Sequence, residues 1–140
     1  MPLPTVRKNN VLNNLFRNVA MPAAPTTWNV ALCRAAPAAD GSGGSEVTAT
    51  GYARVAVAFA DPAAGAVGET SNTGVVQFAT LTAAGGVVTH YKIVDNAGVV
   101  IFFDNLRDAT GTPISRDLVS GSAPSFDIGE LRIDANRVSL

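Results

Sequence analysis

The hydrophobic pattern of this chain changes its period once, and this change limits the folds open to it. Over residues 6–19, apolar side chains recur at the spacing of an α-helix. From Thr26 onward they alternate with polar or small residues, as in half-buried β-strands. Pro22 and Pro25 lie between the two patterns and end the helix. The sequence therefore predicts one N-terminal amphipathic helix followed by a domain built mainly of strands.

About six strands are predicted after the helix, with turn-forming residues every ten or so positions. The clearest hairpin signal is the pair of apolar runs at 87–94 and 99–103, which flank a short polar turn. The predicted strand 126–133 changes phase at Gly129-Glu130, which a β-bulge would correct. This pattern predicts a mainly β fold, either an antiparallel β-sandwich or a small barrel, with the helix attached. The other strands are expected at 26–33, 51–60 and 75–81, and residues 104–124 are expected to be irregular.

The chain is expected to form one domain with extended arms at both termini. Its 140 residues are enough to bury a sizeable core without disulfides or metal. Pro2 and Pro4 push the residues before them toward extended geometry. Arms of this kind gain order only by lying on other segments, which favours an oligomer. We divide the single domain (1–140) into an N-terminal arm (1–10), the helix plus β-sandwich (11–133) and a C-terminal arm (134–140).

Charge and composition exclude several functional classes. Ten basic and eleven acidic residues leave a net charge of -1, so the chain lacks the electrostatic footprint of a nucleic-acid-binding protein. The longest apolar runs, 55–60 and 99–103, are too short to cross a bilayer. Charged residues make up only 15% of the chain, against about 25% in an average domain. Much of the surface is therefore expected to be neutral and able to pack against copies of the same chain.

The motifs predict no catalytic, cofactor or metal site. A single cysteine, Cys33, and a single histidine, His90, exclude an internal disulfide and a cysteine- or histidine-rich metal site. We expect Cys33 to be a small packing residue and His90 to be a half-exposed strand residue bonded to a neighbour. The Gly/Ser stretch 41–45 lacks a phosphate-binding motif and is expected to be a plain loop. Three carboxylates of the irregular segment are spaced too widely for a calcium loop: Asp104, Asp108 and Asp117.

The apolar face of the predicted helix has two interpretations. Either it covers an open face or end of its own sandwich, or it contacts a neighbouring subunit. This stripe consists of Val11, Leu12, Leu15, Phe16 and Val19. The residues expected to make subunit or virion contacts are Pro2, Pro4, Leu12, Leu15, Phe16, Val138 and Leu140.

Several segments resemble the small tail-fibre-like or decoration-type virion structural proteins of tailed bacteriophages. The segments GYARVAVAF (51–59) and NTGVVQFATLTAAGGVVTHYKIVDNAGVVIFF (72–103) carry most of this resemblance. They follow a short amphipathic helix and the strand TTWNVALCR (26–34), in the order found in those proteins. The C-terminal segment FDIGELRI (126–133) is also similar. The resemblance covers roughly residues 9–133.

This resemblance implies a non-enzymatic structural protein of a tailed bacteriophage virion, assembled in the host cytoplasm. It implies multiple symmetric copies joined through terminal arms, edge strands and the helix, on the tail or the capsid. The implied partners are copies of the chain and neighbouring virion proteins, with no cofactor, nucleic acid or membrane. Two alternatives stay open, a capsid decoration (cement) protein and a host-glycan-binding module. The candidate glycan-contacting aromatic residues are Trp28, which is expected to lie in the core, Tyr52 and Tyr91.

Overall fold

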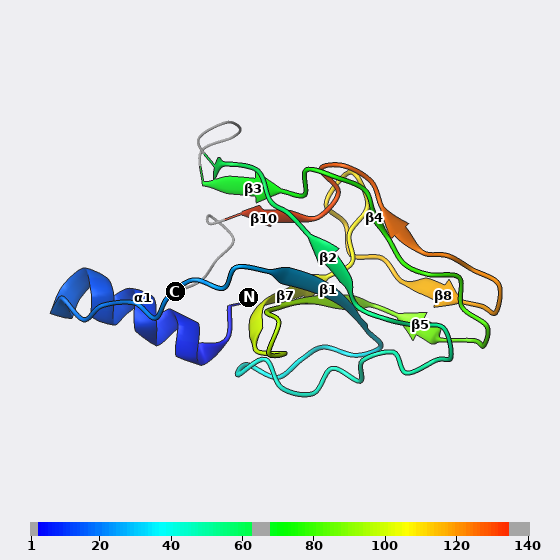
Figure 1. The fold of residues 1–140 in the computed structure, drawn as a ribbon, viewed down its shortest axis with the longest axis horizontal. Coiled ribbons are helices and arrows are strands. Elements are labelled where there is room, and N and C mark those ends of the chain that lie inside the picture. The colour runs from blue at the N-terminus through cyan, green and yellow to red at the C-terminus, as the bar shows by residue number, and fades with distance from the viewer. Residues whose placement is uncertain (1–2, 63–67, 135–140) are drawn as a thin grey trace.

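The computed structural model describes residues 3–62 and 68–134 (Figure 1). Within these residues one helix, α1 (Thr5–Arg17), precedes ten short strands, so the chain is mainly β, as predicted. The strands are β1 (Trp28–Cys33), β2 (Val55–Val57), β3 (Glu69–Ser71), β4 (Val76–Gln77), β5 (Gly86–Val88), β6 (His90–Val94), β7 (Val100–Asn105), β8 (Arg116–Leu118), β9 (Ser125–Phe126) and β10 (Arg132–Asp134).

The largest sheet has four antiparallel strands in the order β2-β1-β6-β7. Three antiparallel two-stranded ribbons pair β3 with β10, β4 with β9 and β5 with β8. Side chains from the large sheet and from the ribbons share one buried core, so the architecture is a small sandwich. The sheets do not close into a barrel in the part of the chain that the structure describes. Within the same ranges, no helix has the length and apolarity needed to cross a membrane.

Strand β1 is buried on both of its faces. Val30 and Leu32 face the main core, and Ala31 and Cys33, which alternate with them, are also buried. The loop 35–46 covers this second face. Its Gly44 lies so close to Cys33 that an added Cβ would be 3.3 Å from Cys33 Sγ. The Gly/Ser stretch is therefore a loop, as predicted, and it closes one side of the sheet.

The predicted hairpin is present as β6 and β7. Ile93 pairs with Phe102, which places both side chains in the core. The Asp95 carboxylate accepts hydrogen bonds from the backbone N–H groups of Ala97 and Val99, and this closes the turn. The predicted strand 87–94 is divided into two strands, however, because β5 pairs with β8 and not with the partners of β6. Residues 104–124 thus contain a strand that the sequence did not predict.

The predicted strand 126–133 is two strands joined by a turn, so the expected β-bulge at Gly129-Glu130 is wrong. Strand β9 pairs with β4, whereas β10 pairs with β3. Gly129 has a φ of +80°, which breaks the ladder between them. The buried Asn72 side chain holds this turn, because it donates to Asp127 O and accepts from Leu131 N–H, both at 2.9 Å.

The N-terminal helix begins one residue before the predicted pattern over 6–19, and the extended arm over 1–10 is therefore wrong for residues 5–10. Pro4 is the N-cap residue, a position where its missing N–H costs nothing, and its carbonyl accepts from the N–H groups of Arg7 and Lys8. The helix ends at Arg17, because Asn18 adopts a left-handed conformation with a φ of 51°. Residues 1–2 and 135–140, which include the predicted contacts Pro2, Val138 and Leu140, lie outside the described residues.

The Glu46 carboxylate fastens the end of the covering loop to the sheet. Arg54 donates two hydrogen bonds to it, at 2.8 and 2.7 Å. The Tyr52 hydroxyl donates to Glu46 Oε1 and accepts from the Leu32 N–H. Lys92 Nζ lies 4.0 Å from Glu46 Oε2. Although partial burial raises the pKa of Glu46, the Arg54 hydrogen bonds and the charges of Arg54 and Lys92 outweigh it, and the pKa is lowered.

We expect this carboxylate to make the fold sensitive to acid. A carboxyl group with a lowered folded-state pKa contributes stability that is fully present above its unfolded-state pKa, which is about 4.3 for Glu. That contribution is lost as the pH falls through the lower pKa of the folded state. Glu46→Gln should therefore lower the melting temperature at neutral pH and reduce its further loss on acidification. Melting curves between about pH 7 and pH 3 test this. An equally steep acid loss in the variant would contradict it.

Candidate functional site

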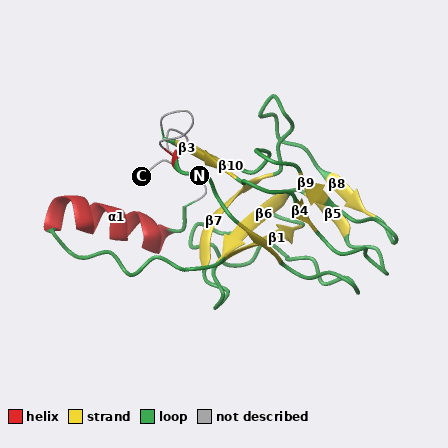
Figure 2. Ribbon diagram, turned by 45° about the horizontal axis from the view of Figure 1, so that its top comes forward, coloured by secondary structure: helices red, strands yellow, loops and turns green. Residues whose placement is uncertain are grey.

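Helix α1 projects from the strands and their connecting loops (residues 28–62 and 68–134, the β-body) instead of covering them (Figures 1 and 2). None of its residues is buried. Leu12, Leu15 and Phe16 expose 40%, 64% and 78% of their surface. The interpretation in which the stripe covers its own sandwich is therefore wrong, and the helix presents an apolar face to solvent.

The N-terminal end of α1 is tied firmly to the β-body. Thr5 donates its backbone N–H and its Oγ1 to the carbonyl of Ala39, at 3.0 and 3.2 Å. Pro4 is buried, and it lies beside Gly41 of the loop and Val100 of β7. The three residues are so close that a Cβ added to Gly41 would lie 3.1 Å from Pro4 Cγ and 3.0 Å from Val100 Cβ. Pro4 is thus an internal anchor, not the exposed contact that the sequence suggests.

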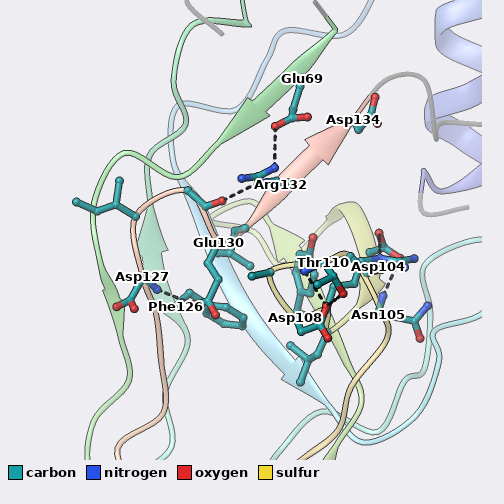
Figure 3. A pocket seen from close by; sticks show the side chains of 18 of the residues that line it. Glu69, Asp104, Asn105, Asp108, Thr110, Phe126, Asp127, Glu130, Arg132 and Asp134 are labelled. Carbon is teal, nitrogen blue, oxygen red and sulfur yellow. Dashed lines mark hydrogen bonds and ion pairs between the residues drawn. The ribbon is translucent and has the colours of Figure 1, made fainter. Parts of the chain in front are cut away.

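A pocket of about 420 Å³ lies toward the other end of β7, between the segments 104–111 and 126–134 (Figure 3). Aromatic rings contribute to its lining. The ring centroid of Tyr91 lies 6.2 Å from that of Phe102 and 6.1 Å from that of Phe126. These three rings belong to β6, β7 and β9, so the pocket opens onto the edge of the main core.

The polar lining of this pocket is acidic. Six carboxylates and two guanidinium groups give the lining a formal excess of four negative charges. Arg107 Nη2 lies 3.3 Å from Asp104 Oδ1. Arg132 Nη1 lies 3.8 Å from Glu69 Oε1, and Figure 3 shows this second pair. Asp104 and Glu69 thus face the guanidinium groups of the lining, and Glu130 Oε1 lies 3.7 Å from Nη2 of Arg116, just outside the lining. The six carboxylates are those of Glu69, Asp104, Asp108, Asp127, Glu130 and Asp134.

Tyr91 provides a hydroxyl at the inner wall of the pocket. The residue is 5% exposed, and burial, with the Asp104 charge adding to it, raises its pKa well above the usual value. The hydroxyl therefore stays protonated and can donate a hydrogen bond. Among residues 3–62 and 68–134, no group forms a hydrogen bond with this hydroxyl. In the same ranges every fully buried polar side-chain atom has a partner, so an unpaired hydroxyl is one that is not fully buried. The hydroxyl thus lies open to the pocket.

The structure separates the three carboxylates singled out in the sequence. Asp104 and Asp108 line the pocket, whereas Asp117 lies on β8 opposite Val87. The Asp108 carboxylate accepts hydrogen bonds from Thr110 and from the N–H of Thr112, which fixes the loop. No group of three or more metal-ligating side chains is found among the residues described. Sequence reasoning missed the pocket because its two segments are distant along the chain.

The remaining candidate residues are packed in the β-body. The half-buried His90 has its Nδ1 2.8 Å from Thr89 Oγ1, which confirms the predicted strand histidine bonded to a neighbour. Cys33 is buried, as predicted. Trp28 is half-buried and packs against the core, and so does Tyr52. Of the three aromatic residues considered for glycan contact, Tyr91 is the one that lines the pocket.

We expect the Cys33 thiol to be unreactive in the folded protein. Burial raises its pKa to about 11, and the thiolate is the reactive species. A chromogenic disulfide reagent at neutral pH should label one thiol per chain in guanidinium chloride and essentially none in native buffer. Rapid labelling of the native chain would show that the covering loop does not protect this cysteine.

A mainly β domain that exposes the apolar face of an amphipathic helix to solvent has the features of a structural, contact-forming protein. The family model described as "Podophage GP4 fiber I protein gp80" matches residues 2–134. The chain therefore belongs to this family of phage fibre proteins, which are structural components of the virion. A search of curated proteins finds no match.

Proposed function

We propose that this chain is a non-enzymatic structural protein that assembles in multiple symmetric copies through the exposed face of α1. The observation that carries this proposal is the exposure of Leu12, Leu15 and Phe16 on a helix that its own core does not cover. A helix of 13 residues that includes four asparagines is marginal in water by itself. Burial of its apolar face against a neighbour would stabilise both the helix and the assembly.

We further propose that the protein belongs to the tail and is assembled with its virion neighbours in the host cytoplasm. The family description names a fibre protein of a podophage, which favours the tail over the capsid. Residues Pro2, Val138 and Leu140 stay proposed contacts with copies of the chain or with other virion proteins. A capsid decoration protein is the alternative.

Copy number in purified particles distinguishes the two positions. Cryo-electron microscopy should find from three to about a dozen copies, arranged with the symmetry of the tail. Hundreds of copies spread over the capsid lattice would contradict the tail assignment and would favour the decoration role.

Binding of a host glycan in the pocket is a second candidate function. It is favoured by the Tyr91 hydroxyl and by the carboxylates on the rim, which supply hydrogen-bonding groups beside aromatic rings. A glycan array probed with the full chain should then show hits that Tyr91→Phe reduces. An array without hits would remove this function and would leave the assembly proposal unchanged.

A further inference from the structure

Charge is distributed unevenly along this chain. No acidic residue precedes Asp40, and the four basic residues before it give residues 1–39 a formal charge of +4. The remaining residues must carry -5, because the whole chain carries -1. Such an asymmetry favours contact between the N-terminal part of one molecule and the rest of another.

One basic residue of α1 lies within its apolar face. Lys8, Leu12 and Leu15 are spaced at i, i+4 and i+7, which places them on the same side of the helix with Phe16. Arg17 follows Lys8 by nine residues, or two and a half helical turns, and therefore lies on the opposite side. The face that needs a partner thus combines exposed apolar side chains with a positive charge.

The pocket is the complement of this face. Its aromatic rings can contact apolar side chains, and its six carboxylates keep a formal excess of three negative charges when Arg116, which pairs with Glu130, is counted with the two guanidinium groups of the lining. We propose that the face of α1 formed by Lys8, Leu12, Leu15 and Phe16 docks into the acidic pocket of a neighbouring copy. This inference rests on the proposed self-assembly and names the surface that receives the helix.

The receiving pocket is assigned to another copy because no residue of α1 lines the pocket of its own chain. Pro4 and Thr5 hold the start of the helix beside Val100, and the helix runs from there away from the β-body (Figure 2). The segment 104–111 of the pocket begins at the far end of β7, which is about 17 Å long. A contact between two different surfaces is heterologous, so repeated docking closes a ring or continues as a filament.

Pairing of two α1 helices through the same face is disfavoured by their charge. It would bring Lys8 of one copy toward Lys8 of the other, with Arg7 and Arg17 on both helices and no acidic residue on either. Docking into the pocket meets the opposite charge instead.

Charge reversal on the two sides of α1 tests the proposal by sedimentation of the full chain. Lys8→Glu should raise the dissociation constant for self-association by about tenfold or more. Arg17→Glu, the matched control, makes the same charge change on the opposite side and should raise it by less than about threefold. The wild-type association should also weaken as salt rises from about 0.05 M to 0.5 M. Equal effects of the two variants, or association that strengthens with salt, would overturn the proposal.

Disulfide trapping between two variants that each introduce one cysteine tests the geometry. Leu15 lies on the docking face, and Ala109 is an exposed residue of the pocket lining. A mixture of Leu15→Cys and Ala109→Cys chains should form a disulfide-linked heterodimer under mild oxidation. Asn14→Cys, which lies away from the docking face, should not do so with Ala109→Cys. Cys33 is buried and should not interfere.

The outcomes separate this inference from the proposed function. If the chain self-associates and loses association in the Leu15/Phe16 double serine variant, but traps no disulfide between positions 15 and 109, the receiving surface is wrong and assembly through α1 stands. If removal of residues 135–140 abolishes association while Lys8→Glu does not, these residues make the contact in place of α1 and the proposal is overturned. A chain that never self-associates contradicts both.

Discussion

Replacing Leu15 and Phe16 together by serine is expected to abolish self-association and to leave the melting temperature of the dilute monomer almost unchanged. The two side chains are 64% and 78% exposed, so they contribute little to the core of their own molecule. Burying a Leu or Phe side chain at an interface contributes about 1.5–3 kcal/mol each. Their loss should therefore weaken association by roughly a hundredfold or more. Sedimentation measures the association, and circular dichroism measures the melting temperature.

The matched control removes two exposed apolar side chains outside α1. Val75 and Val119 are 55% and 53% exposed and belong to loops of the β-body. Their double replacement by serine should leave association within about twofold of wild type. If this control weakened association as strongly as the α1 variant, the contact surface would not be specific to the helix.

The second large effect is expected at the centre of the core. Phe78 is 1% exposed, and its ring lies 5.9 Å from Tyr52 in a stacked arrangement and 6.4 Å from Phe126 edge-on. Phe78→Ala should lower the free energy of unfolding by about 3–5 kcal/mol, through lost burial and the cavity left behind. Urea denaturation of the full chain measures this. The loss is a large fraction of the roughly 5–15 kcal/mol that stabilises a domain of ordinary size.

A half-buried phenylalanine on β7 provides the comparison. Phe103 lies opposite Lys92, on the side of the sheet away from the main core. Phe103→Ala should cost less than Phe78→Ala, because less of its surface leaves water on folding. A loss below about 1 kcal/mol for Phe78→Ala would show that this ring does not support the core.

The elements that the sequence predicted well are those decided by local patterns. The stripe of α1, the alternation in β1 and the polar turn between β6 and β7 each depend on residues near one another along the chain. Pro4 is the instructive exception. Two prolines suggested an extended arm, but one proline at the N-cap begins the helix and is buried against the loop.

The elements that sequence reasoning missed depend on long-range partners. The apolar residues of 126–133 have the spacing of one strand, but β9 and β10 pair with β4 and β3. The signal available was Gly129, whose positive φ suits a turn. The acidic pocket was not predictable either, because it brings together two segments from different parts of the chain. An amphipathic pattern shows that a helix needs a partner, but it does not show whether that partner is the same chain.

The mass of the purified full-length chain in solution, measured by light scattering over a range of concentrations, tests the central claim most directly. We expect the wild-type mass to rise with concentration above 14.3 kDa, to a fixed multiple if docking closes a ring, and the Leu15/Phe16 double variant to stay at 14.3 kDa. A wild-type chain that remained a monomer at every concentration would contradict assembly through α1.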